Sequence, residues 1–212
     1  DKVFAIVGAH GTANNLADNS KDRLGARGVP SLFVNTGFSG FAVKRKFPTL
    51  FPLFSTYAME AKIMGSYIKE NFGNKKLGLI YQNDDFGADA LKGFDAIGLK
   101  FDETIPYVSG TQNATTATTW IQKLAAAKVE VVYVFGVTTA TAAAIGVAAA
   151  AGYKPQWVFG SVGADATTIA GQTTVPVALL NGALSASFMP DAADTSDEYV
   201  KFFREVNADY NK

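Results

Sequence analysis

The sequence predicts an α/β fold built on parallel sheets that are flanked by helices. Short apolar runs alternate with longer segments of helical period, and the run Val131–Phe135 shows no polar alternation. Strands separated by helices of roughly 10–15 residues form βαβ units, whose strands pair in parallel. Such a sheet is covered on both faces, which accounts for a strand that is apolar throughout.

The N-terminal part of the chain predicts two strands and an extended segment. We expect Val3–Val7 to form a buried strand, a helix to follow through Leu16 and Leu24, and Ser31–Val34 to form the second strand. Phe47–Ser55 contains two prolines and has no helical period. It is therefore expected to be extended, and it is the best candidate for a domain boundary.

The remaining elements alternate regularly. Thr56–Phe72 is amphipathic with a period near 3.6, and Gly73 is expected to end this helix. The other expected strands are Leu77–Tyr81, Phe101–Tyr107, Val131–Phe135, Trp157–Phe159 and Leu184–Phe188, and the other expected helices are Phe86–Ile97, Thr116–Lys128, the alanine-rich Ala140–Ala151, and Ser196–Tyr210.

Composition excludes several classes of protein. The 212 residues suffice for one large α/β domain or two small ones, and 19 basic residues balance 19 acidic ones. A chain without net charge has no general attraction to nucleic acid or to an anionic membrane. The absence of cysteine excludes disulfides and thiolate ligands, and it fits an oxidising compartment.

The ends of the chain give two further expectations. No apolar run approaches the about 20 residues of a membrane span, so direct membrane insertion is not expected. No signal peptide is visible, and the chain passes from Asp1 straight into the first apolar run. We interpret this abrupt start as that of a segment cut from a longer protein.

The segments that follow the expected strands predict a small-molecule site. Open parallel sheets bind ligands beyond the carboxyl ends of their strands, and these segments are rich in glycine and hydroxyl groups. Backbone N–H groups and hydroxyls there would suit a carboxylate. The aromatic residues Phe38, Phe86 and Phe135 also lie at these ends, either in the site or in the core.

Enzymatic motifs are weak in this chain. Gly8–Gly11 lacks the spacing of a dinucleotide fingerprint, and Phe41 stands where a nucleophile elbow would need its last glycine. His10 is the only histidine, so a catalytic triad would have to use it. Asp84, Asp85 and Asp89 are better explained as helix-capping groups than as metal ligands. No catalytic residue, metal or cofactor is therefore expected.

Three motifs resemble the type I periplasmic binding proteins of branched-chain amino acid ABC importers, the leucine/isoleucine/valine-binding family. They are VPSLFVNTG at 29–37, LIYQNDDFG at 79–87 and AGYKP at 151–155. The resemblance runs along the whole chain and implies that further segments precede and follow it. It implies a bilobal fold with an incomplete N-terminal lobe, a small-molecule ligand, a permease partner, and a location in the periplasm or, with a lipid anchor, outside a Gram-positive cell.

The resemblance also implies a division of the chain and a set of ligand positions. Residues 1–53 would belong to lobe one, 54–183 to lobe two, and 184–212 would return to lobe one, with ligand trapped between the lobes by hinge closure. The implied or expected ligand-binding residues are Gly11, Thr12, Phe38, Ser39, Phe86, Phe135, Val137 and Ser161.

Two of these positions depart from the family pattern. Val137 replaces an aromatic residue, and Ser161 replaces the acid that holds the ligand's α-amino group. A buried ammonium would then lack a counter-ion, so we expect a carboxylate or aromatic compound rather than a standard amino acid. The same fold could also serve as the sensory domain of a receptor or regulator, and an α/β enzyme is a third alternative.

Overall fold

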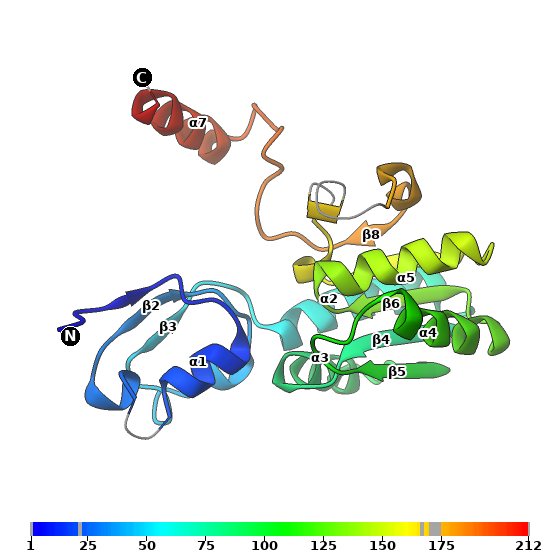
Figure 1. The fold of residues 1–212 in the computed structure, drawn as a ribbon, viewed down its shortest axis with the longest axis horizontal. Coiled ribbons are helices and arrows are strands. Elements are labelled where there is room, and N and C mark those ends of the chain that lie inside the picture. The colour runs from blue at the N-terminus through cyan, green and yellow to red at the C-terminus, as the bar shows by residue number, and fades with distance from the viewer. Residues whose placement is uncertain (1, 21–22, 166–167, 170–174, 212) are drawn as a thin grey trace.

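The computed structural model describes residues 2–20, 23–165, 168–169 and 175–211, and it has the predicted α/β architecture. Its strands form two parallel sheets: a three-stranded sheet of order β1-β2-β3 and a five-stranded sheet of order β5-β4-β6-β7-β8. The two sheets lie at opposite ends of the molecule in Figure 1. The chain thus folds into two α/β units.

The first unit has one covered and one open sheet face. Its elements are β1 (Ile6–Val7), α1 (Thr12–Asp18), the 3-10 turn η1 (Gly25–Arg27), β2 (Ser31–Val34), the 3-10 turn η2 (Ser39–Ala42) and β3 (Leu50–Pro52). Val34, Phe41 and Leu50 are fully buried and form the small core of this unit. The opposite face carries the row Val7, Leu32 and Phe51, which the strand register places side by side.

That open face corrects one prediction. The first strand was expected to be buried over Val3–Val7, but it covers only Ile6–Val7, and Val7 is 67% exposed. An apolar run is buried only where another layer covers it, and no described helix packs on this face. The expected first helix is also shorter, because α1 ends at Asp18.

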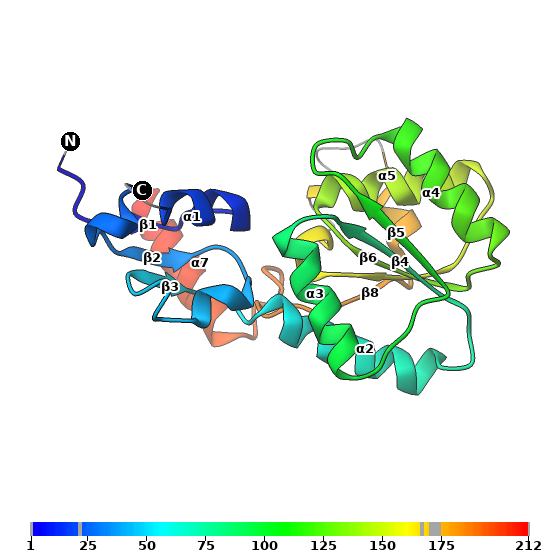
Figure 2. The ribbon, with the colours of Figure 1, turned by 90° about the horizontal axis from the view of Figure 1, so that it is seen from below.

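The second unit is a sheet with helices on both faces. Its strands are β4 (Leu77–Gln82), β5 (Glu103–Tyr107), β6 (Val131–Phe135), β7 (Gln156–Phe159) and β8 (Leu184–Ser185). One face is covered by α2 (Tyr57–Phe72) and α3 (Asp85–Ala96), and the other by α4 (Ala114–Ala126) and α5 (Thr138–Ala150), as Figure 2 shows. All five residues of β6, the central strand, are buried, as predicted.

Local sequence explains the main elements of this unit. Thr56 accepts a hydrogen bond from the Met59 amide and so caps α2, and Asn113 caps α4 in the same way. In α5 the small side chains Ala140, Ala144 and Ala148 form one buried face, which lets the helix lie close to the sheet. Two further 3-10 turns lie at Ser161–Gly163 (η3) and Val177–Leu180 (η4).

One segment, between β3 and α2, connects the two units. A second segment follows β8, where the expected strand Leu184–Phe188 ends early at Ser185, and leads to α7. The ring centroids of Phe54 and Phe188 lie 4.5 Å apart, so the two segments touch. The lobe boundaries 53/54 and 183/184 remain predictions, and Leu184 and Ser185 still pair with β7 in the second sheet.

The last helix, α7 (Glu198–Tyr210), lies apart from both sheets in Figure 1. Val200 is its one buried residue, and its aromatic side chains, such as Phe202 and Phe203, are exposed. No helix in the described part of the chain has the length and apolar character that crossing a bilayer requires.

Candidate functional site

A cavity of about 500 Å³ lies between the two units, at the carboxyl ends of their strands. The first unit contributes residues that follow β1 and β2, and the second contributes residues that follow β4, β5, β6 and β7, with part of α2. In the five-stranded sheet the strand order reverses at β4, which lies between β5 and β6. Such switch points are where open parallel sheets hold their ligands.

The first unit presents the start of α1 to the cavity. Gly11 precedes this helix with a φ of 91°, a conformation that favours glycine. The Thr12 hydroxyl is buried and hydrogen-bonded to the Thr36 hydroxyl at 2.7 Å, so the two chain segments that follow β1 and β2 are tied together here. Both Gly11 and Thr12, predicted from the resemblance, line the cavity.

A polar network lies at the end of β4. Gln82 Nε2 donates to Asp84 Oδ2 at 2.7 Å, and the Tyr107 hydroxyl donates to Gln82 Oε1 at 3.1 Å. Burial raises the pKa of Tyr107 to about 12, so this hydroxyl keeps its proton. Asp84 Oδ1 accepts from the amides of Phe86 and Gly87, which confirms its predicted role as a cap of α3.

Aromatic rings form the floor of the cavity. Phe86 lines it, and its ring centroid lies 4.7 Å from that of Tyr57 and 4.9 Å from that of Phe135. Phe135 is buried behind these rings and does not line the cavity. Of the three aromatic residues singled out from the sequence, only Phe86 therefore reaches the site.

Phe38 and Ser39 lie elsewhere. Ser39 donates two hydrogen bonds to the buried carboxylate of Asp89 on α3, from its amide at 2.9 Å and from its hydroxyl at 2.5 Å. Lys92 also donates to Asp89, at 3.0 Å, and lies over the Phe38 ring. Phe38 and Ser39, two of the expected ligand-binding residues, thus link η2 of the first unit to α3 of the second.

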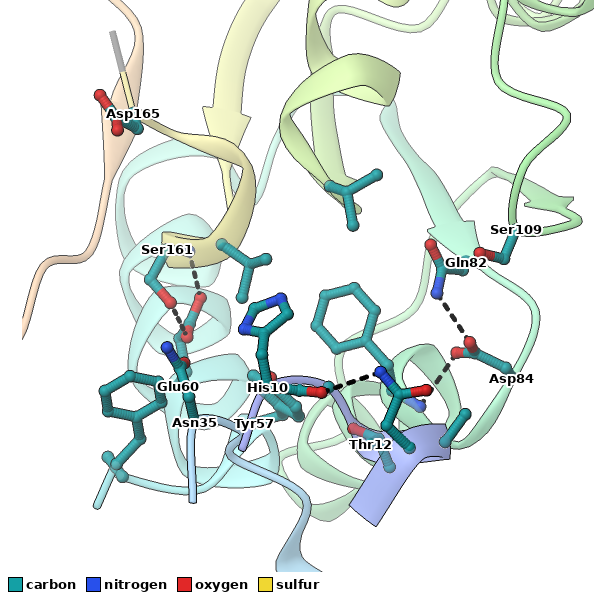
Figure 3. Close-up of a pocket in the computed structure, with 18 of the residues that line it drawn as sticks. His10, Thr12, Asn35, Tyr57, Glu60, Gln82, Asp84, Ser109, Ser161 and Asp165 are labelled. Carbon is teal, nitrogen blue, oxygen red and sulfur yellow. Dashed lines mark hydrogen bonds between the residues drawn. The ribbon is translucent and has the colours of Figure 1, made fainter. Parts of the chain in front are cut away.

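A carboxylate occupies the place where the sequence indicated none. Ser161 lines the cavity, and Glu60 lies beside it on the first turn of α2. Glu60 Oε1 accepts from the Ser161 amide at 2.7 Å and Oε2 from its hydroxyl at 2.6 Å (Figure 3). The premise that no acid lies at this position is therefore wrong, because Glu60, 101 positions away in the sequence, lies beside Ser161, and the expected ligand class remains a prediction.

The remaining predicted residues have simple placements. Val137 lines the cavity at the N-terminus of α5, and its amide donates to the Tyr107 hydroxyl at 3.2 Å. His10 lines the cavity from an exposed position, and within the described residues its ring makes no hydrogen bond to a hydroxyl. The described part of the chain has no group of three or more His, Cys, Asp or Glu side chains that could hold a metal ion.

Sequence reasoning missed several lining residues, notably Asn35, Tyr57, Glu60 and Gln82. Asn35 and Gln82 directly follow or end a predicted strand, so the rule that located the site could have included them. Tyr57 and Glu60 lie on the first turn of the helix that follows the predicted domain boundary. Helix starts next to such a crossing face the space between two units, and this was the available signal.

Comparisons with known proteins identify the family and the fold. A family model described as a periplasmic binding protein matches residues 1–212. A substrate-binding periplasmic protein from Ralstonia solanacearum has a similar fold, with a TM-score of 0.79 and 23% identity over 97% of this chain and 56% of that one. No curated protein matches the chain significantly.

Two further solved structures differ in their described cargo. One is a branched-chain amino acid ABC transporter protein from Thermus thermophilus with bound valine, at TM-score 0.76 and 17% identity over 98% of this chain and 52% of that one. The other is a fatty acid ABC transporter substrate-binding protein from Thermomonospora curvata. Its TM-score is 0.77 and its sequence identity is 18%, over 99% of this chain and 52% of that one. The chain therefore spans about half the length of these structures.

Proposed function

The chain belongs to the periplasmic binding protein family, and from this premise we propose that it is the ligand-binding part of an extracytoplasmic solute-binding protein for an ABC importer. The cavity between the two units carries the proposal. Its volume of about 500 Å³ suits a small organic molecule, and it combines aromatic walls with a few fixed polar groups. We propose that the protein binds and releases its cargo without converting it chemically.

The segment between β3 and α2 supports capture by hinge closure. Phe54 lies on this segment and touches Phe188, which lies on the segment after β8, and both rings line the cavity. A short connecting segment lets two units rotate about it, and ligand that contacts both units favours the closed arrangement. The cargo would then pass to a membrane permease, and we propose the periplasm, or a lipid-anchored extracytoplasmic position, as its location.

The ligand of this site is proposed to be a small carboxylate-bearing or aromatic compound, or an amino acid. Several small-molecule classes fit a cavity that has aromatic rings, hydroxyls and carboxylates in its lining. The relatives of similar fold carry valine in one case and are described as fatty-acid-binding in another. The cavity chemistry is used below to choose among these classes.

A thermal-shift screen of the intact protein tests the proposed function. The panel contains amino acids, aromatic acids, short fatty acids and the corresponding amines. A ligand that binds only the folded state adds about 2.7 kcal/mol of stability at a hundred times its dissociation constant, which raises the melting temperature by several degrees. If no compound of this size raises it, the proposal fails.

A matched pair of variants locates any binding that is found. Ser109 lines the cavity and is exposed, so Ser109→Trp should fill part of the cavity and weaken binding without disturbing the core. Its neighbour Val108 is 62% exposed and does not line the cavity, so Val108→Trp should leave affinity unchanged. Equal effects of the two substitutions would place the ligand outside this cavity.

A further inference from the structure

The carboxylate of Glu60 lies at the cavity and, as far as the structure describes the chain, has hydrogen-bond donors but no positive charge beside it. Both of its oxygens accept hydrogen bonds from Ser161, from the amide at 2.7 Å and from the hydroxyl at 2.6 Å. These bonds hold the carboxylate in one orientation at the cavity wall, where Figure 3 shows it close to Ser161 and Asn35. They are neutral donors, so they leave its charge uncompensated.

Within the described part of the chain, no positively charged side chain pairs with Glu60. The described residues form three ion pairs, Lys75–Glu130, Lys92–Asp89 and Lys100–Asp95, none of which involves it. Burial raises the pKa of Glu60, which expresses the same cost of an unpaired charge away from water. A cation brought by a ligand would remove that cost.

The rest of the cavity lining also favours a positively charged ligand group over a negatively charged one. It includes the carboxylate of Asp84 as well as that of Glu60, and it contains neither lysine nor arginine among the described residues. The lining histidine, His10, lies at an exposed position. A ligand with only a carboxylate would meet the carboxylates of Glu60 and Asp84 and no lysine or arginine in the described lining.

The walls of the cavity suit the remainder of an amine-bearing molecule. Tyr57 and Phe86 stand edge to face at 4.7 Å between ring centroids and line the cavity together with Phe54 and Phe188. Aromatic faces attract ammonium groups and also accept apolar carbon chains. The cavity thus combines an anionic anchor with apolar walls.

We propose that Glu60 determines specificity by holding a protonated amine of the ligand, so that the site selects amine-bearing compounds with an aromatic or aliphatic body over the matching carboxylic acids. This inference rests on the proposed function and narrows its ligand class. Ser161, on the segment after β7, orients the Glu60 carboxylate through its amide and its hydroxyl. The amine is the required group, and a carboxylate on the same molecule is not.

The experiment compares matched probes by calorimetry on the intact protein. One pair is 2-phenylethylamine and 3-phenylpropionate, and the other is hexylamine and hexanoate. We expect each amine to bind at least tenfold more tightly than its acid. Glu60→Gln keeps the size of the side chain and removes its charge, and should weaken amine binding roughly 10- to 100-fold, as expected for a lost charge-assisted hydrogen bond.

The control is Glu70→Gln, which makes the same charge change at an exposed position of the same helix. It should retain the preference for amines. Tighter binding of the acids, or a preference that survives in Glu60→Gln, overturns the inference. If neither pair binds while another compound of the broad screen does, the inference fails and the proposed function stands; if nothing in either set binds, the proposed function itself fails.

Discussion

The carboxylate of Asp89 links the two units, and its removal gives the sharpest test of how they are held together. Asp89 is fully buried on α3 and accepts from the Ser39 amide at 2.9 Å, from the Ser39 hydroxyl at 2.5 Å and from Lys92 at 3.0 Å. Lys92 is largely exposed and returns to water when its partner is removed. The two Ser39 donors are the groups that lose an acceptor.

The expected loss of unfolding free energy follows from those two hydrogen bonds. A hydrogen bond to a charged group contributes about 1.5–3 kcal/mol, and water that enters the space left by the carboxylate restores part of the stability lost with the two bonds. Asp89→Ala should therefore lower the free energy of unfolding by about 3 kcal/mol. Asp89→Asn keeps the shape and can retain one acceptor and one donor, so its cost should be about 1–2 kcal/mol.

Urea denaturation followed by far-ultraviolet circular dichroism measures these changes, because the signal includes both units. The matched control is Asp95→Asn on the same helix, whose ion pair with Lys100 at 3.3 Å is exposed and should be worth less than about 0.5 kcal/mol. A double-mutant cycle of Ser39→Ala with Asp89→Asn should show a coupling of about 1 kcal/mol. An Asp89→Ala variant as stable as Asp95→Asn would refute the link.

Three further predictions concern single positions in the second unit. The raised pKa of Glu60 means that the folded chain keeps a proton which the unfolded chain, with an ordinary value of 4.5, has released, so stability falls as pH rises through this window. Glu60→Gln cannot ionise, and its melting temperature without ligand should exceed that of the wild type by a margin that grows from pH 4 to pH 7; a constant margin would contradict this. Gly93→Ala should cost about 1–3 kcal/mol in denaturant titrations, because a Cβ there would lie 2.3 Å from the Ala58 carbonyl oxygen, whereas Gly146→Ala has room and should stabilise α5 by about 0.5–1 kcal/mol. Asp84→Ala removes the cap of α3 and should cost about 1 kcal/mol in the same titration, and no loss would show that the cap does not contribute.

The sequence predicted the architecture because hydrophobic patterns report local burial. The apolar run Val131–Phe135 was correctly interpreted as a strand covered on both faces. The same rule failed at Val7, because the local pattern cannot say whether a covering layer is present. The motif resemblance agrees with the family match over the whole chain.

The site was predicted in part. Gly11, Thr12, Phe86, Val137 and Ser161 come together at one cavity, since each lies just beyond a predicted strand end. The pairing of Glu60 with Ser161 joins residues 101 positions apart, and no local motif encodes such a contact. Ser39 was assigned to a ligand on the family resemblance, while the structure pairs it with Asp89, which lies 50 positions away on α3.

The strand order of the second sheet has a consequence for how the chain is made. Every pairing in the sheet is parallel, so no strand can join its neighbour until the crossover segment between them has been synthesised. From β6 onward each new strand joins the edge left by the previous one, first β7 against β6 and then β8 against β7. During synthesis from the N-terminus, the partly folded nascent chain therefore exposes one unpaired, apolar sheet edge until Ser185 has left the ribosome. Nascent chains interrupted between Phe159 and Ser185 should be the species that chaperones retain most strongly.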